Sequence, residues 1–380
     1  MSQFTLPTTI LWGMEEKELF VSSCRQRNIV VICSQTRNRL HDPIVLDILH
    51  SIEMVAASVA ISSHVESNPS YEAVMNTIRD LSNHACDLVL AIGGGSVIDC
   101  AKASAYGVRH LDKELWSLFL TVCDGPQGAL PVYVINTTSG TGTEINCCAV
   151  ITRQCEKRAI VNDSLFPVKT WIIPELAVSM SYEHTIPIFL DCMYHSIEGF
   201  LSGHSTEFGR QSAISCLNLC LRHAQSLQSR YNTIGFREDL ALASIYSSFA
   251  DMYGGCLSIH SLGHAISGLR PAVSHGMSIM VVSLAYYSLL HEKGDPSFVD
   301  KETTLLESLC IRGSTSIAQL LSALYLQMGI NGISLSQFGF MSDDLQIIYA
   351  LARECVGELF DNDPITLSDN DFSRILTKSF

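Results

Sequence analysis

The stretch CDLVLAIGGGSVIDCAKASAYG (86–107) decides the fold class of this chain. Its first half is an apolar run, typical of a strand buried on both faces of a parallel sheet, and from Val97 onward the pattern is helical. Three glycines and Ser96 join the two halves. Glycine lets the backbone approach a ligand closely, and the free N–H groups of a helix start attract anions. The turn therefore suits a pyrophosphate. The plainer alternative is a tight turn capped by Ser96, because the GxGxxG fingerprint is absent.

The flanking sequence repeats the same alternation of strand and helix. Apolar runs predict strands at 28–34, 57–63 and 131–136, and helical spacing predicts helices at 43–55 and 71–85. This order indicates a Rossmann-like, doubly wound parallel sheet in an α/β domain. Beyond about residue 180 only long helical patterns follow, near 186–203, 206–228, 237–252, 276–292, 314–328 and 343–358. We therefore expect an α/β domain over 1–180 and an all-helical domain over 181–380, with the boundary between Pro174 and Pro187.

Charge and hydropathy exclude several classes of protein. The chain has 380 residues and a formal charge of -14, with 38 acidic and 24 basic residues. Such an acidic chain lacks the basic surface that binds the nucleic-acid backbone, so we expect no nucleic-acid partner. No apolar run reaches the length of a membrane span, and the N-terminal residues lack the features of an export signal. We therefore expect no membrane association.

The cysteines indicate a reducing compartment. There are 14, none forms a CxxC pair, and several, such as Cys33, Cys100 and Cys192, lie within apolar stretches. We interpret them as reduced thiols, mostly small core residues, in a cytoplasmic protein. The pairs Cys147–Cys148 and Cys216/Cys220 leave open a minor alternative, metal binding or redox sensing.

A second loop strengthens the case for a nucleotide. TTSGTGTE (137–144) also follows a predicted strand and combines four threonine hydroxyls, one serine hydroxyl and two glycines. Hydroxyls and free N–H groups at the carboxyl end of a strand can bind phosphate, ribose or an amide. Two such loops on one sheet predict a single nucleotide crevice.

The helical half contains candidate metal ligands. Asp191 and His195 are four residues apart in an apolar segment, and His260 and His264 repeat this spacing, with His275 further along. Residues four apart share a helix face, and Asp and His are ligands for divalent first-row metals. Asp191, His195 and two of the three later histidines could supply four ligands. The alternative for any single histidine is a hydrogen-bonded core residue. A metal together with a nucleotide crevice indicates hydride transfer at a polarised carbonyl.

Together these motifs resemble those of the iron-containing (group III) alcohol dehydrogenases. GGGSVIDCAKA (93–103) is similar to the family's GGGSxxDxAKA loop, and TTSGTGTE is similar to its PTTxGTGSE loop. DCMYHSIEGF (191–200) is similar to the DAxxHxxE segment, and HSLGH (260–264) with His275-Gly276 matches the paired histidines and the following His-Gly. The likeness runs from about Pro7 to the C-terminus.

The resemblance implies a role for each matching residue. Asp191, His195, His260 and His275 would hold a divalent metal, most often Fe²⁺ and sometimes Zn²⁺. His264 would be the catalytic residue, near the substrate and the nicotinamide, where it relays a proton. The NAD(P)H cofactor would contact Ser34, Gly94, Gly95, Ser96, Asp99, Thr137, Thr138, Thr141 and Lys157.

The chain also departs from the family pattern. Ser34 replaces the Asp that often follows the first strand in members that prefer NAD, so NADPH is plausible. Asn136 replaces a proline before the two threonines, and Asp363 replaces the asparagine of a C-terminal Asn-Pro pair. Ile173 and Leu190 are further departures. These positions bear on the subfamily rather than on the ligand set.

The expected reaction interconverts a small aldehyde and its alcohol. Arg270 lies between His264 and His275 and could pair with an anionic aldehyde such as phosphonoacetaldehyde or succinic semialdehyde; the alternative is a solvated surface arginine. Rival functions are a glycerol-type polyol dehydrogenase with zinc, a cyclase resembling dehydroquinate synthase, and a non-catalytic relative with a binding role. Because related proteins are often dimers or larger, the resemblance also implies a homodimer.

Overall fold

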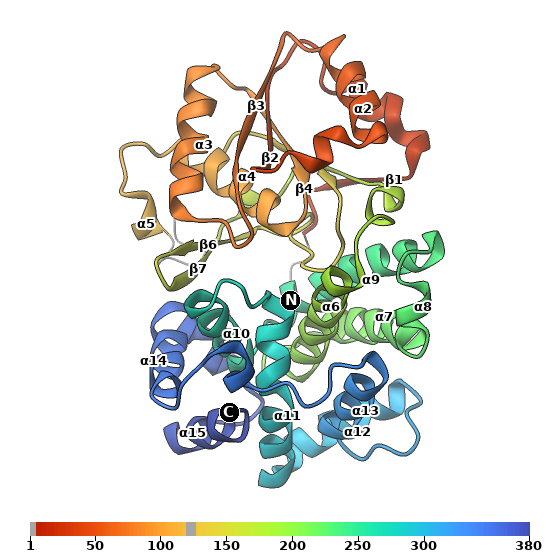
Figure 1. The fold of residues 1–380 in the computed structure, drawn as a ribbon, viewed down its shortest axis with the longest axis vertical. Coiled ribbons are helices and arrows are strands. Elements are labelled where there is room, and N and C mark those ends of the chain that lie inside the picture. The colour runs from red at the N-terminus through yellow and green to blue at the C-terminus, as the bar shows by residue number, and fades with distance from the viewer. Residues whose placement is uncertain (1–4, 119–126) are drawn as a thin grey trace. The chain divides into compact units, whose positions relative to one another are not determined.

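The computed structural model describes residues 5–118 and 127–380, and the chain divides into two compact units (Figure 1). Unit 1 spans Met1–Ser179 and unit 2 spans Met180–Phe380. Cys123, one of the cysteines interpreted above as reduced, lies outside the described residues. Over those residues, no helix combines the length and the apolar character needed to cross a membrane.

Unit 1 is built on a six-stranded sheet in which every paired strand is parallel to its neighbour. The spatial order is β1-β8-β5-β4-β2-β3. The strands are β1 (Thr9–Trp12), β2 (Asn28–Ser34), β3 (Ser58–Val65), β4 (Leu88–Gly93), β5 (Val132–Asn136) and β8 (Lys169–Ile172). A separate antiparallel hairpin consists of β6 (Cys148–Arg153) and β7 (Glu156–Val161).

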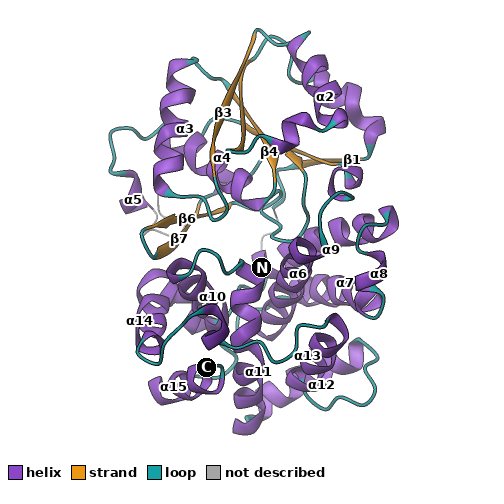
Figure 2. Ribbon diagram, viewed as in Figure 1, coloured by secondary structure: helices purple, strands orange, loops and turns teal. Residues whose placement is uncertain are grey.

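Helices cover both faces of this sheet, which confirms the doubly wound α/β prediction (Figure 2). Because side chains alternate along a strand, Val30 and Val89 join one buried cluster, with α3 and α4, while Val31 and Leu90 join the other, with α1 and α2. Burial on both faces explains the near-continuous apolar runs. The helices of unit 1 are α1 (Lys17–Ser22), α2 (Pro43–Glu53), α3 (Tyr71–Asn83), α4 (Gly95–Gly107) and α5 (Leu115–Leu118).

The chain reverses its direction of travel across the sheet between β2 and β4. From β2 it moves outward to β3, crosses back to β4 on the other side of β2, and continues to β5 and β8. In open parallel sheets, ligands bind beyond the carboxyl ends of the strands at such a reversal. Ser34 ends β2 and Gly93 ends β4, so two of the sequence motifs meet at this position.

Unit 2 is helical, and its regular elements over Met180–Phe380 include no strand (Figure 2). Its α-helices are α6 (Tyr182–Leu201), α7 (Glu207–Ala224), α8 (Leu227–Arg230), α9 (Ile234–Met252), α10 (Ser258–Leu269), α11 (His275–Lys293), α12 (Pro296–Ser308), α13 (Ile317–Met328), α14 (Asp344–Val356) and α15 (Asp369–Lys378). Short 3₁₀ turns occur in both units, at η1 (Met14–Glu16), η2 (Asn38–His41), η3 (Asp163–Leu165), η4 (Pro174–Ala177), η5 (Leu335–Phe338) and η6 (Gly357–Asn362).

Pro187 lies inside α6 rather than at a boundary between elements. The Ser181 hydroxyl accepts a hydrogen bond from the His184 N–H and caps the helix, which begins at Tyr182, five residues before Pro187. Pro187 is the sixth residue of α6, where a proline has no N–H to donate to the carbonyl four residues earlier, yet the helix continues through it. The carbonyl group of Pro187 lies against Gly276, where any Cβ would clash with it, and this close approach brings the start of α11 onto α6.

Candidate functional site

The candidate metal ligands of unit 2 come from three helices. Asp191 and His195 lie on α6, His260 and His264 lie on α10, and His275 is the first residue of α11. The first four are buried, with exposed fractions of 2%, 8%, 4% and 6%. The three helices therefore bring side chains up to 84 positions apart in the sequence into one polar cluster inside an apolar core.

The distances within this cluster are short. The Oδ1 atom of Asp191 lies 3.7 Å from Nδ1 of His195 and 3.7 Å from Nε2 of His275. The Nε2 atoms of His260 and His275 are 2.8 Å apart. One ring nitrogen from each of His260, His264 and His275 falls within 4.8 Å of the others. The structure thus brings all five predicted side chains together.

Two of the imidazoles are oriented by hydrogen bonds at Nδ1. His195 Nδ1 contacts the backbone carbonyl of Asp191 at 2.9 Å, and His260 Nδ1 contacts Oε1 of Glu198 at 3.2 Å. The second carboxylate oxygen of Glu198 accepts the Leu257 N–H at 2.8 Å. Metal-binding histidines usually donate one ring N–H in this way and use the other nitrogen as the ligand. The arrangement directs Nδ1 of both rings toward protein oxygens, and Nε2 of His260 lies 2.8 Å from Nε2 of His275.

The surroundings of the cluster are acidic and favour a cation. Burial lowers the pKa of His195, but the carboxylates of Asp191, Asp251 and Glu198 outweigh it and leave that pKa above its usual value. Burial has the opposite consequence for Glu198, because it raises the pKa of this carboxyl to about 8 and so disfavours its charged form. One carboxylate and several imidazoles form a donor set that suits Fe²⁺ or Zn²⁺. The residues present therefore fit the divalent metal that the sequence implies.

A cysteine that the sequence analysis did not single out lies beside this cluster. Sγ of Cys256 and ring nitrogens of His195 and His260 all lie within 4.8 Å of one another. The Cys256 thiol donates a hydrogen bond to Oδ1 of Asp251, on α9, at 3.1 Å. The only sequence signal was its position four residues before His260, which is weak because Cys256 precedes the start of α10.

The two loops predicted to bind a nucleotide, both in unit 1, are in contact with each other. The Thr137 N–H donates to the Gly93 carbonyl at 3.0 Å. A Cβ at Gly94 would lie 2.6 Å from Oγ1 of Thr138, and a Cβ at Gly95 would lie 2.9 Å from Oγ1 of Thr141. Glycine is thus required where the threonine loop packs on the glycine turn. Asn136, in place of a proline, accepts the Thr138 N–H at 3.0 Å and shapes the second loop.

Lys157 and Ser96 are linked through a residue that the sequence analysis missed. Lys157 Nζ donates to Oδ1 of Asn68 at 3.2 Å, and the Asn68 N–H donates to Oγ of Ser96 at 3.3 Å. Lys157 in the hairpin and Ser96 in the glycine turn therefore both contact Asn68. Asn68 has φ = 57°, and the turn-rich stretch Ser67-Asn68-Pro69-Ser70 was the available signal.

Asp99 uses both carboxylate oxygens on the protein. Oδ1 accepts the Thr143 hydroxyl at 2.5 Å, and Oδ2 accepts the Val150 N–H at 3.2 Å. The fully buried Lys102 donates to Thr143 Oγ1 at 2.8 Å and to Oδ1 of Asn146 at 3.0 Å. These contacts hold the threonine loop (137–144) and the β6–β7 hairpin against α4. Asp99 therefore has a structural role, whether or not it also contacts a cofactor.

Ser34 lies at the end of β2, where the strand order reverses, and its carbonyl accepts the Arg37 N–H at 3.0 Å. Its hydroxyl is 3.1 Å from Oγ1 of Thr36. Arg37 Nε donates to the Ser63 hydroxyl at 2.9 Å, which holds this guanidinium near the carboxyl ends of β2 and β3.

Arg270 is engaged by protein groups. Its guanidinium lies 3.4 Å from both Oδ2 of Asp344 and the Gly339 carbonyl, and it stacks on the Phe340 ring, 4.9 Å from the centroid. These contacts already compensate its charge. They lend no support to the prediction that Arg270 binds an anionic substrate.

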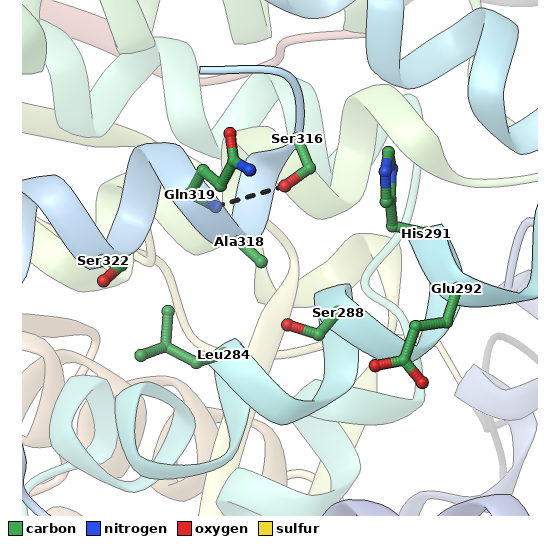
Figure 3. A pocket seen from close by; sticks show the side chains of 8 residues that line it. All are labelled: Leu284, Ser288, His291, Glu292, Ser316, Ala318, Gln319 and Ser322. Carbon is green, nitrogen blue, oxygen red and sulfur yellow. Dashed lines mark hydrogen bonds between the residues drawn. The ribbon is translucent and has the colours of Figure 1, made fainter. Parts of the chain in front are cut away.

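A surface hollow of about 380 Å³ on unit 2 contains none of the predicted site residues (Figure 3). Helices α11 and α13 supply its lining. His291 faces it and is held 2.6 Å from Oε2 of Glu302, whose Oε1 accepts the Ile317 N–H at the start of α13. His291 therefore serves the packing of unit 2 and is not part of the histidine cluster.

A parallel sheet with phosphate-type loops and a carboxylate–histidine cluster define a class of nucleotide- and metal-dependent oxidoreductases. The family model "Iron-containing alcohol dehydrogenase" matches residues 7–174, and "Fe-containing alcohol dehydrogenase family, C-terminal" matches residues 185–380. This chain belongs to the iron-containing alcohol dehydrogenase family. It is an iron-type oxidoreductase that acts on alcohols or aldehydes, and members of the family use NAD(P)H and a divalent metal.

Individual relatives agree with this assignment. A long-chain primary alcohol dehydrogenase of Thermoanaerobacter ethanolicus is 23% identical over 87% of this chain and 84% of its own length. A 4-hydroxybutyrate dehydrogenase of Clostridium kluyveri is 24% identical over 73% of this chain and 74% of its own length. The fold matches that of an archaeal alcohol dehydrogenase from a Red Sea brine pool, with a TM-score of 0.89, 21% identity, and coverage of 100% of this chain and 99% of the other.

Proposed function

We propose that this chain is a metal-dependent aldehyde reductase that uses NADPH and acts on a small aldehyde to give a primary alcohol. The observation that carries the proposal is the convergence of Asp191, His195, His260 and His275 in one buried cluster. Names of relatives support the substrate class, since one is a long-chain primary alcohol dehydrogenase and another acts on 4-hydroxybutyrate, also a primary alcohol.

Asp191, His195, His260 and His275 would hold the metal, with Fe²⁺ the first candidate and Zn²⁺ the second. When bound, the metal supplies Lewis-acid chemistry that makes a substrate carbonyl a better hydride acceptor. The chain's own contribution is orientation: the Asp191 carbonyl fixes the ring of His195, and Glu198 fixes the ring of His260. Burial keeps bulk water away from these donors.

The cofactor would lie over the two loops of unit 1. Gly94, Gly95 and Ser96 would contact the pyrophosphate at the start of α4, where free N–H groups attract anions. Thr137, Thr138, Thr141 and Lys157 would contact the ribose and nicotinamide, and Asp99 would contribute near the turn. Ser34 leaves room for a 2′-phosphate, and Arg37 offers a countercharge, so we favour NADPH over NADH.

His264 would move the proton that accompanies hydride transfer. It is 6% exposed, and its ring centroid lies 5.3 Å from that of His260 and 4.9 Å from that of His275. An imidazole beside the ligands suits a general acid, the role in which histidine is most often used. In the reductive direction it would donate a proton to the substrate oxygen and recover one from water.

Whether the substrate is anionic can be tested by comparing activity on an anionic and on a neutral aldehyde. An anionic aldehyde, such as phosphonoacetaldehyde or succinic semialdehyde, would need a countercharge, and Arg270 is the residue the sequence suggested. The Arg270→Ala variant would lose activity on an anionic aldehyde but keep it on a neutral one of similar size if Arg270 binds substrate. Because Asp344 already compensates Arg270, we expect both activities to change equally.

The main test measures NADPH and NADH oxidation by chelator-stripped protein with a panel of small aldehydes, before and after anaerobic addition of Fe²⁺ or Zn²⁺. We expect activity only after metal addition, with NADPH preferred, and none in His260→Ala. Stoichiometric metal binding without turnover of any aldehyde would contradict the proposal and favour a non-catalytic role.

We also propose a cytoplasmic homodimer. Support for the location comes from the thirteen cysteines in the described part of the chain, which all carry free thiols. Light scattering after size exclusion would give the oligomeric state, and a monomeric mass at micromolar concentration would contradict the dimer.

A further inference from the structure

We propose that Cys256 is a further metal ligand, so that the metal centre carries a sulfur donor in addition to its carboxylate and imidazoles. This inference rests on the proposed function, because it concerns the same metal. Its basis is that Cys256 Sγ and one ring nitrogen each of His195 and His260 lie within 4.8 Å of one another, a second group that shares His260 with the group of His260, His264 and His275. Two of these residues belong to the expected ligand set, and the third was not part of any motif.

The backbone at Cys256 is fixed on both sides, so the position of its sulfur is well defined. The Cys256 carbonyl accepts the side-chain amide of Asn362 at 2.8 Å. The next residue, Leu257, donates its N–H to Glu198, which also contacts His260. Gly255 precedes it with φ = 86°, a backbone conformation that turns the chain into α10. The same carboxylate therefore orients His260 and the segment that carries the thiol.

The surroundings of the sulfur resemble those of a ligand more than those of a core thiol. The Cys256 side chain is only 6% exposed, yet its neighbours are polar: Asp251 at 3.1 Å, with the histidines beyond. A core cysteine behaves as a small apolar residue, and Cys24 and Cys33 show that setting, both within the apolar cluster that α1 and α2 form with one face of the sheet. Cys256 instead joins the polar cluster of unit 2.

Binding requires the thiolate. As the bond between sulfur and metal forms, the S–H bond breaks, its electron pair becomes the ligand pair, and the proton passes to the Asp251 carboxylate and then to water. No oxidant or reductant takes part. Thiolate is a soft ligand that favours Zn²⁺ over harder cations, so a sulfur donor shifts the preference of this site toward zinc.

The test uses Co²⁺ as a probe that reports its own ligands. The full-length protein is stripped with chelator and reconstituted anaerobically with Co²⁺, and absorption is recorded from the near ultraviolet to the visible. A thiolate ligand adds an intense charge-transfer band in the near ultraviolet, whereas oxygen and nitrogen ligands alone give only weak visible bands. We expect the intense band in the wild type, its loss in Cys256→Ser, and its retention in Cys310→Ser, where the cysteine is exposed.

Two outcomes separate this inference from the proposed function. Stoichiometric Co²⁺ with visible bands but no charge-transfer band in the wild type, or the same band in Cys256→Ser, overturns the role of Cys256 and leaves the metal-dependent reductase standing. Failure to bind any Co²⁺ overturns both.

A second readout covers the case in which the serine variant folds poorly. The Zn²⁺ affinity of Cys256→Ala is measured by competition with a chromophoric chelator. Removal of a residue that only orients a ligand lowers metal affinity by about 10- to 100-fold, so we expect the loss of a direct ligand to lower it by at least as much. The Fe²⁺ affinity should fall less. Equal losses for both metals with an unchanged melting temperature would contradict a sulfur ligand.

Discussion

The Nε2 atoms of His260 and His275 lie 2.8 Å apart. Nδ1 of His260 is directed at the Glu198 carboxyl group, so its Nε2 is the nitrogen that faces His275. Two imidazole nitrogens at this distance, beside the Asp191 carboxylate, converge on a position that suits a shared cation.

The first prediction concerns the removal of one of these ligands. His275→Ala should lower bound divalent metal by about tenfold or more, since the loss of even an outer-shell partner has that effect. Metal content after dialysis, measured by mass spectrometry, checks it. The control is His50→Ala, whose side chain is exposed on α2 and should leave metal content unchanged. Full metal retention in His275→Ala would remove His275 from the ligand set.

Glu198 provides the second prediction. It orients His260 from a fully buried position, so Glu198→Gln should weaken metal binding by about 10- to 100-fold while the ligands themselves stay intact. Chelator competition gives the affinity. The matched control is Glu207→Gln, at the exposed start of α7. If both variants bind metal as tightly as the wild type, Glu198 does not position His260.

The third prediction is a dependence of stability on pH. Burial raises the pKa of Asp363 from 3.8 to about 6, although Ser258 and Tyr286 donate hydrogen bonds to it. The folded state therefore holds a proton that the unfolded state has lost, and stability falls as pH rises from about 4 to 6. The shift corresponds to about 3 kcal/mol.

Asp363→Asn, which restores the residue common in the family, should remove this part of the pH dependence. Urea unfolding at several pH values between the two pKa values measures the slope for wild type and variant. Identical slopes in the two proteins would show that Asp363 does not titrate in this range.

Cofactor choice supplies the fourth prediction. Ser34→Asp places a carboxylate at the carboxyl end of β2, where it would repel a 2′-phosphate, so the ratio of kcat/KM for NADPH to that for NADH should fall about tenfold or more, an effect of about 1.4 kcal/mol. Arg37→Ala should lower the same ratio through NADPH alone. A wild type that prefers NADH would contradict the interpretation of Ser34.

The fifth prediction tests the close approach of α11 to α6. A Cβ at Gly276 would clash with the Pro187 carbonyl, so Gly276→Ala should destabilise unit 2 by about 1–3 kcal/mol and displace the neighbouring His275. Thermal unfolding and metal content provide the readouts. Gly235→Ala, in α9, is the control: because nothing lies within 4 Å of its Cβ position, it should leave metal content unchanged and should not lower the melting temperature.

The sequence by itself determined the layers of the fold. Apolar runs and helical spacing are local patterns, and the structure places β2 at Asn28–Ser34 and α3 at Tyr71–Asn83, close to the predicted ranges. Two strands of the six-stranded sheet were missed, β1 (Thr9–Trp12) and β8 (Lys169–Ile172), because four residues are too few to show a period. The resemblance then supplied the ligand set.

Tertiary structure decided the contacts between distant residues. Glu198 contacts His260, which is 62 positions further along the sequence. Lys157 contacts Asn68 at a separation of 89 positions, and Arg270 contacts Asp344 at a separation of 74 positions. Sequence spacing relates side chains only within a helix or strand, whereas these pairs depend on how separate elements pack. The histidine cluster could be predicted because its members lie in recognisable motifs. Cys256 lies in no motif, so only the packing of separate elements shows that it is beside the cluster.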